Sequence, residues 1–145
     1  MIVGFIGLGN LGEKLAATLL RNNINLIVHD KLKKNAVQLI EKGANWEDTT
    51  IELAKKSDFI ITCLPSPSIS ATVMETRYGV IEGISKGKIW IEMSTPANRR
   101  YQDYQNLFKI KEDFQPTALF LVVVIGLQLV IFLFFPVAKE KYLKK

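Results

Sequence analysis

Three glycines near the start of the chain constrain its fold more than any other feature. Gly7, Gly9 and Gly12 follow a short apolar run in the spacing G-x-G-x-x-G. In a strand-turn-helix unit, the first glycine permits a tight turn, the second lets a pyrophosphate approach bare backbone, and the third lets the helix pack closely on the strand. The helix N-terminus also offers N–H groups and partial positive charge to phosphates. The spacing therefore predicts a pyrophosphate site at this turn.

The apolar pattern on both sides of the turn predicts a β-α-β unit. Residues 2–6 are a continuous apolar run, as expected for a parallel strand that is covered on both faces. From Leu11 onward apolar residues recur at helical spacing, which predicts an amphipathic helix. A second apolar strand at 26–28 leads to Asp30, 18 residues after Gly12. Such a unit places an acid at this position to hydrogen-bond an adenosine ribose, so the predicted ligand is a dinucleotide.

Helices and strands continue to alternate up to residue 95. Helices are expected at 31–42, up to 56 after a cap at Asp48 or Thr49, and at 68–77, and strands at 44–46, 59–64 and 88–93. This order predicts an α/β fold, namely a Rossmann-type doubly wound parallel sheet. Ligands bind outside the carboxyl ends of the strands in such sheets. The glycine turn, Asp30, residues 64–66 and residues 94–95 all fall at such ends, which supports dinucleotide binding.

The length and charge of the chain limit the other functions open to it. A chain of 145 residues holds one modest domain and is too short for a complete two-domain dehydrogenase. The net charge of +5 lies mostly in the tail, because residues 1–95 carry 11 Lys/Arg against 10 Asp/Glu. That balance argues against nucleic-acid binding. A single cysteine, Cys63, suits a reducing compartment, and a strand that starts at Ile2 leaves no room for a leader, so we expect a cytoplasmic domain.

Three blocks of the sequence resemble the cofactor domain of the β-hydroxyacid dehydrogenases, a family that includes 3-hydroxyisobutyrate dehydrogenase and 6-phosphogluconate dehydrogenase. The blocks are GFIGLGNLG at 4–12, DFIITCLP at 58–65 and EMST at 92–95. The resemblance implies that the pyrophosphate is held by Gly7, Leu8, Gly9, Asn10, Leu11 and Gly12. It also implies that Leu64 and Pro65 line the ribose side, that Thr95 lies near the nicotinamide, and that Ser94 contacts a substrate carboxylate.

The cofactor can be NAD or NADP, and Asp30 favours NAD because an acid at this position disfavours a 2′-phosphate. Lys31, Lys33 and Lys34 weaken that preference, although a solvated helix start also explains them. Asp30 could instead cap a turn, and Ser94 and Thr95 could cap a helix over residues 99–112. His29, Cys63 and the two tryptophans are interpreted as structural residues.

The resemblance ends after Thr95. Members of the family continue with a glycine-rich helix that carries a lysine, which serves as general acid/base during hydride transfer, and then with a helical substrate domain. Residues 96–145 contain one glycine, Gly126, and no such motif. Lys109 and Lys111 lie in a polar segment and are not assigned this role. No catalytic residue and no metal ligand is therefore predicted, and turnover by this chain alone is doubtful.

The tail has a composition of its own. Residues 117–135 carry no charge and are bounded by Pro116 and Pro136, and a helix of this length would nearly cross a bilayer core. The lysines that follow favour a cytoplasmic C-terminus, which would export the dinucleotide domain. Three interpretations stay open: a membrane span, a buried or interfacial helix, and an aberrant continuation of a dehydrogenase gene.

These interpretations define the predicted domains and partners. The chain divides into a Rossmann domain at 1–96, a polar helical linker at 97–115, an apolar helix at 116–136 and a basic tail at 137–145. The partners considered are a dinucleotide, a membrane through residues 117–135 and a second copy of the chain. The main hypothesis is the cofactor domain of a dehydrogenase without its catalytic half. The alternatives are a membrane-tethered nucleotide-binding or interaction module without catalysis, and a reductase that uses a partner subunit's lysine.

Overall fold

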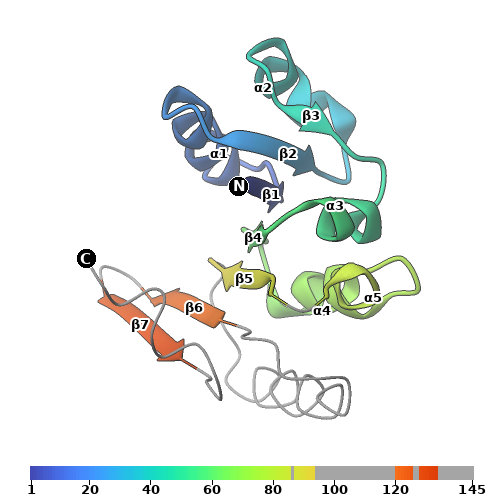
Figure 1. Cartoon of the computed structure of the whole chain (residues 1–145), viewed down its shortest axis with the longest axis vertical. Coiled ribbons are helices and arrows are strands. Elements are labelled where there is room, and N and C mark those ends of the chain that lie inside the picture. The colour runs from blue at the N-terminus through green and yellow to red at the C-terminus, as the bar shows by residue number, and fades with distance from the viewer. Residues whose placement is uncertain (86, 94–119, 126–127, 134–145) are drawn as a thin grey trace.

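The computed structural model describes residues 1–85, 87–93, 120–125 and 128–133. They form a seven-stranded sheet in the order β3-β2-β1-β4-β5-β6-β7 (Figure 1). The first five strands are parallel, with helices on both faces, so the predicted Rossmann-type sheet is confirmed for this part of the chain. The strands are β1 (Ile2–Ile6), β2 (Asn25–His29), β3 (Asn45–Trp46), β4 (Phe59–Thr62) and β5 (Ile89–Glu92).

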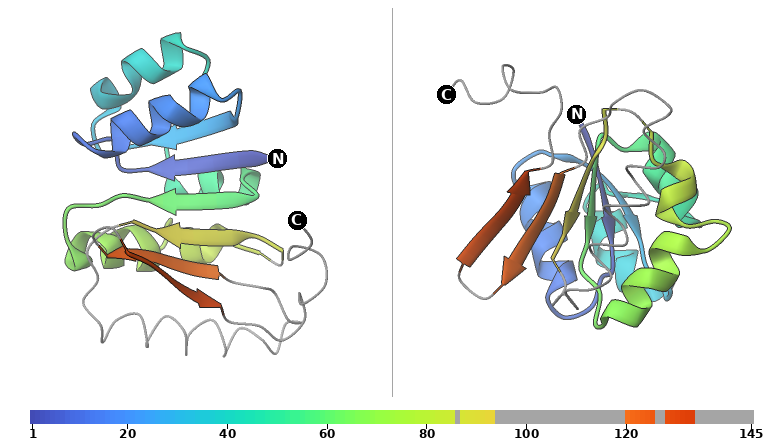
Figure 2. Two further views of the ribbon diagram at one scale, coloured as in Figure 1. Left: turned by 90° about the vertical axis from the view of Figure 1, so that its left-hand side faces the viewer. Right: turned by 90° about the horizontal axis from the view of Figure 1, so that it is seen from below.

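The connections between these strands are helical. The helices are α1 (Gly12–Arg21), a 3-10 turn η1 (Lys33–Ala36), α2 (Val37–Glu41), α3 (Thr50–Lys56), α4 (Pro67–Glu75) and α5 (Val80–Gly83). Figure 2 shows α1 and α2 on one face of the sheet and α3, α4 and α5 on the other. Each face has its own core. Phe5, Ala16 and Leu39 are buried on the first face, and Leu53, Met74 and Trp90 on the second.

The register of the parallel strands brings their carboxyl ends to one level. Ile6, the last residue of β1, pairs with His29 of β2 and with Thr62 of β4. Thr62 in turn pairs with Glu92, the last residue of β5. A buried hydrogen bond from Trp90 Nε1 to Thr62 Oγ1, 2.8 Å long, ties β5 to β4 below this edge. The residues that follow these strands therefore meet along one edge of the sheet.

Two helices differ from the prediction. The helix expected at 31–42 is replaced by the 3-10 turn η1 and by α2, which begins only at Val37, and the Leu32 N–H donates to the Asp30 side chain in a turn before them. The sequence pattern also missed α5, a helix of four residues that is too short to show a clear apolar period. Leu11, with which the predicted amphipathic helix begins, immediately precedes α1 and is 58% exposed.

The predicted apolar helix at 117–135 is wrong for the residues that the structure describes there. Residues 120–125 form β6 (Phe120–Ile125), parallel to β5, and residues 128–133 form β7 (Gln128–Leu133), antiparallel to β6. Valine, isoleucine and phenylalanine favour strands, and a continuous apolar run fits a buried strand as well as a helix. The edge of β5 supplies backbone partners that a sequence pattern cannot reveal.

No helix in the described ranges has the length and apolar character needed to cross a bilayer. The predicted linker at 97–115 and the basic tail at 137–145 lie outside the described residues.

Candidate functional site

A pocket of about 990 Å³ opens at the carboxyl edge of the sheet. Its lining contains most of the residues predicted to bind a cofactor. These are Gly7, Gly9, Asn10, Leu11, Gly12, Asp30, Leu64 and Pro65. The register described above explains why they meet, since they follow β1, β2 and β4, whose ends are level. Residues from three separate stretches of sequence thus face one cavity of the size that small-molecule sites usually have.

Three residues predicted to bind the cofactor or the substrate are not among the described residues that line this pocket. The side chain of Leu8 is only 2% exposed and packs in the core beside α1, so Leu8 can act at the site only through its backbone. Ser94 and Thr95 lie outside the described residues. Met93, directly before them, does line the pocket, and its N–H donates to Thr62 O at 2.8 Å.

The glycine turn has the geometry that its spacing predicts. Gly7 has φ +96°, a conformation that L side chains rarely adopt, and a Cβ there would lie 2.3 Å from the Cys63 carbonyl oxygen. A Cβ built on Gly9 would meet nothing within 4 Å, so this backbone borders open space in the pocket. The turn therefore provides a cradle of bare backbone that fits a pyrophosphate.

The start of α1 adds donors to this cradle. The first hydrogen bond into the helix runs from Glu13 N to Gly9 O at 3.0 Å. The N–H groups immediately before Glu13 have no intrahelical acceptor, and the residue at the N-cap, Leu11, has no side chain that could cap them. Together with the positive end of the helix dipole, these groups can bind an anion.

Asp30 connects the glycine turn to the segment after β2. Its Oδ2 accepts the Leu8 N–H at 2.7 Å, and its Oδ1 accepts the Leu32 N–H at 2.8 Å and the Asn35 side-chain N–H at 3.0 Å. The two interpretations of Asp30 are therefore compatible, because the residue forms a local turn and also lines the pocket. Its carboxylate is held by three donors and does not need a ligand to fix its orientation.

The helix α4 supplies a wall that the sequence pattern did not reveal. Ile69, Thr72 and Val73 line the pocket and share one face of this helix at i, i+3 and i+4. Ser66 caps the helix by accepting the Ile69 N–H at 3.3 Å, and Pro67 occupies its first turn. Two features of the sequence could have identified this wall. Its three lining residues recur at helical spacing, and the helix starts shortly after β4, a strand that ends at the pocket.

Three large apolar side chains are exposed around the pocket. Leu11, Leu32 and Ile69 are large apolar residues with 58%, 49% and 43% of their surface exposed, and all three line the pocket. Exposed apolar side chains that gather around one cavity are typical of a ligand site. An aromatic base could cover them.

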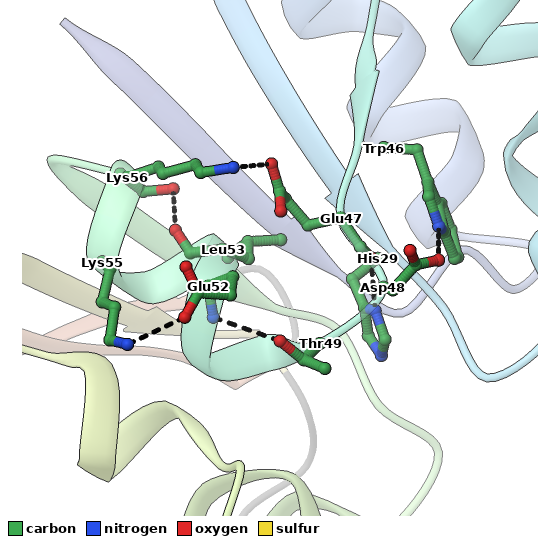
Figure 3. A network of polar contacts seen from close by, with 10 residues as sticks. His29, Trp46, Glu47, Asp48, Thr49, Glu52, Leu53, Lys55 and Lys56 are labelled. Carbon is green, nitrogen blue, oxygen red and sulfur yellow. Dashed lines mark hydrogen bonds and ion pairs between the residues drawn. The ribbon is translucent and has the colours of Figure 1, made fainter.

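His29 and Cys63 also line the pocket but lack the environment of catalytic groups. Nδ1 of His29 lies 2.9 Å from Glu47 O, and because a carbonyl can only accept, this nitrogen carries the proton. The ring also stacks on Trp46, with centroids 5.5 Å apart (Figure 3). Burial raises the pKa of the Cys63 thiol, and the negative charge of Glu92 raises it further, so the reactive thiolate is disfavoured.

Two ion pairs near β3 and α3 lie outside the lining of the pocket. Figure 3 shows Lys56 paired with Glu47 and Lys55 paired with Glu52, the latter at 2.8 Å. The hydrogen bond from Lys55 lowers the pKa of Glu52, and the hydrogen bond to Glu47 raises the pKa of Lys56. Within the described ranges no group of three His, Cys, Asp or Glu side chains could hold a metal ion.

Comparison with known proteins agrees with this geometry. The sequence profile of the NAD binding domain of 6-phosphogluconate dehydrogenase matches residues 2–113. A probable mitochondrial 3-hydroxyisobutyrate dehydrogenase from Dictyostelium discoideum is 39% identical over 100 residues, which are 68% of this chain and 31% of that protein. Glyoxylate/succinic semialdehyde reductase 1 from Arabidopsis thaliana is 35% identical over 95 residues, 66% of this chain and 33% of that protein. The chain thus spans about a third of the length of these relatives.

Solved structures share the fold. Psf3 in complex with NADP+ and 2-OPP matches with a TM-score of 0.75 at 24% identity, over 86% of this chain and 43% of that one. A variant imine reductase from Myxococcus stipitatus in complex with NAD+ matches with a TM-score of 0.71 at 17% identity, over 86% and 41%. The sequence match covers more than half of the chain, and the pocket has the glycine turn that such a domain needs. The chain therefore belongs to the family of the NAD binding domain of 6-phosphogluconate dehydrogenase, and it is an NAD(P)-binding domain of the kind found in 3-hydroxyisobutyrate dehydrogenase-like oxidoreductases.

Proposed function

We propose that the pocket at the carboxyl edge of the sheet binds the dinucleotide, with the turn from Gly7 to Gly12 on the pyrophosphate. The backbone of Leu8 and the exposed Asn10 and Leu11 belong to this turn. Asp30 would accept a hydroxyl of the adenosine ribose, and Leu64 and Pro65 would line the ribose side. The open space beside the Gly9 backbone carries this proposal, because it lies next to uncapped helix N–H groups.

The cofactor preference follows from charge. A carboxylate at the ribose can accept a hydroxyl proton but repels the 2′-phosphate of NADP. Among the described residues that line the pocket, Lys31 is the one charged residue besides Asp30. The proposed cofactor is therefore NAD, with weaker binding of NADP.

Titration of the protein with NADH and with NADPH, followed by cofactor fluorescence, tests both proposals. Saturable binding with a lower Kd for NADH is the expected result. A folded protein that binds neither cofactor at millimolar concentration would overturn the proposed site. Equal affinity for the two cofactors would overturn only the preference for NAD.

The reaction proposed at this site is the hydride transfer of the full-length relatives, of which this chain spans about a third. A bound nicotinamide supplies or accepts hydride, and the printed names of the relatives suggest a small hydroxyacid or the corresponding aldehyde as the substrate class. Thr95 would lie near the nicotinamide, and Ser94 would contact a substrate carboxylate. We assign the cofactor domain to residues 1–96, with the linker, apolar segment and basic tail after it.

Hydride transfer also needs a group that moves a proton to or from the substrate oxygen. Residues 96–145 lack the glycine-rich lysine segment that the family resemblance implies for this role. We therefore expect these 145 residues to bind the cofactor without turnover. Incubation with 3-hydroxyisobutyrate and NAD should produce no NADH absorbance. A signal that appears only after a partner subunit is added would indicate that the partner supplies the missing lysine.

The alternative of a membrane-tethered module is less well supported. It requires residues 117–135 to form a helix, and the described parts of that segment form β6 and β7. A cytoplasmic location, where dinucleotides are abundant and Cys63 stays reduced, is the location we propose. The homo-oligomer remains a prediction that analytical ultracentrifugation can test.

A further inference from the structure

Asn35 makes one side-chain contact that the cofactor-binding pattern does not require. Its Nδ2 donates to Asp30 Oδ1 at 3.0 Å. The backbone holds Asn35 in place for this contact, since its own N–H donates to Leu32 O at 2.9 Å and starts the 3-10 turn. Asn35 is half-buried and is not among the described residues that line the pocket, whereas Asp30, which its side chain contacts, is.

The contact completes the set of donors around one carboxylate. A carboxylate offers about four lone-pair positions, two on each oxygen. The Leu32 N–H and the Asn35 amide occupy both positions on Oδ1, and the Leu8 N–H occupies one on Oδ2. One position remains, on the oxygen that already touches the glycine turn. Asp30 is thus oriented to accept one hydroxyl group next to the predicted pyrophosphate site.

Without Asn35, the carboxylate would be less constrained. Oδ1 would keep only the Leu32 N–H and Oδ2 the Leu8 N–H, so one of the three donors that hold the group would be lost. A carboxylate held by two donors departs more readily from the orientation that presents Oδ2 to a ribose hydroxyl. This change weakens NAD binding, whereas the negative charge stays in place and its effect on NADP changes little.

We propose that Asn35 is a positioning residue that sets the preference for NAD over NADP by fixing the Asp30 carboxylate. This inference rests on the proposed function, because it requires the dinucleotide to bind with its ribose at Asp30. A positioning role and a purely structural role for Asn35 predict different ratios of NAD and NADP affinity. A residue that only stabilises the 3-10 turn would change the stability of the domain and the affinity for both cofactors together, and would leave their ratio unchanged.

The test compares Kd values for NADH and NADPH in the full chain and in its Asn35→Ala variant, with circular dichroism as a check on folding. Loss of a hydrogen bond to a charged group predicts a Kd for NADH about tenfold higher, while the Kd for NADPH changes by about twofold or less. The ratio of the two Kd values should therefore shift by about fivefold or more toward NADP. Gln38→Ala is the matched control, since Gln38 is exposed on the following helix and does not line the pocket.

A second and a third variant make the result decisive. Asn35→Ser has too short a side chain to reach Asp30 and should reproduce the shifted ratio, whereas Asn35→Gln keeps the amide donor and should restore most of the original ratio. An unchanged ratio in folded Asn35→Ala or Asn35→Ser protein would overturn the inference. Loss of folding in both would do the same, because Asn35 would then be structural. If the unmodified chain binds neither cofactor, the proposed function itself fails, which is a different outcome.

Discussion

Gly12 lies directly against the backbone of Gly7. A Cβ built on Gly12 would come within 1.9 Å of the Gly7 carbonyl oxygen and 3.3 Å of the Phe5 ring. The first helix can therefore approach the first strand this closely only because Gly12 lacks a side chain. This contact fixes the angle at which the helix N-terminus points toward the pocket.

Replacing Gly12 with alanine should damage both the fold and the site. The obstructing atom is backbone, which cannot rotate away, so α1 must move. We expect the free energy of unfolding to fall by about 1–3 kcal/mol, as for other overpacked positions. Cofactor affinity should fall as well, because the helix N–H groups move with the helix. Urea unfolding and NADH titration measure the two effects, and an unchanged unfolding midpoint would contradict the close contact.

Gly9→Ala separates binding from folding. A Cβ at Gly9 meets no atom within 4 Å, so the free energy of unfolding should change by no more than about 0.5 kcal/mol. The same Cβ would occupy space proposed for the pyrophosphate, and we expect the Kd for NADH to rise about tenfold or more. Thermal denaturation and fluorescence titration give the two readouts. Normal NADH affinity in this variant would place the pyrophosphate elsewhere.

Thr49→Ala should affect stability without affecting binding. Thr49 caps α3 by accepting the Glu52 N–H at 3.4 Å (Figure 3), and α3 does not line the pocket. Loss of an N-cap typically costs about 0.5–2 kcal/mol, and the length of this bond points to the lower part of that range. Thr49→Ser retains the hydroxyl and serves as the control. The variant Thr49→Ala is expected to unfold at lower urea concentration and to keep its Kd for NADH.

Cys63 should react slowly with iodoacetamide. Burial raises the pKa of its thiol, so at pH 8 the native protein contains less thiolate than a free cysteine does. Excess NADH should slow the reaction further, since Cys63 lines the pocket. Cys63 is the only cysteine of the sequence, so mass spectrometry reports on this site alone. Alkylation as fast as that of a cysteine peptide would contradict the buried environment.

The raised pKa of Cys63 also predicts that the stability of the protein falls at alkaline pH. The pKa of Cys63 is higher in the native protein than in the unfolded chain. The contribution of this thiol to the free energy of unfolding is therefore fully present below the unfolded pKa. It is lost as the pH rises through the native pKa. Cys63→Ala should lack this loss in stability at alkaline pH. Urea unfolding of both proteins at pH 7 and at pH 10 compares them.

Local steric and periodic signals made much of this protein predictable. The spacing of Gly7, Gly9 and Gly12 specifies one kind of turn, because Gly7 takes a positive φ, Gly9 borders open space and Gly12 lies against Gly7. The apolar runs of β1, β2, β4 and β5 and their alternation with helices predicted the parallel sheet. The position of Asp30 after β2 placed it at the edge where the strands end.

Other features depended on partners that are distant in sequence. Leu8 lines the core and not the pocket, and Asp30 takes part of its orientation from the Leu8 N–H, 22 residues away. The wall from α4 joins the pocket only because β4 lies beside β1 in the sheet.

The sequence by itself determined the Rossmann-type core and the glycine turn, because short-range sterics and the period of apolar residues decide both. Only the tertiary structure decided that the apolar stretches at 120–125 and 128–133 pair as strands and that the Leu8 N–H reaches Asp30. A helix satisfies its hydrogen bonds within its own segment, whereas a strand and the half-buried Asp30 carboxylate take partners from elsewhere in the chain. Those partners exist only once the sheet has formed.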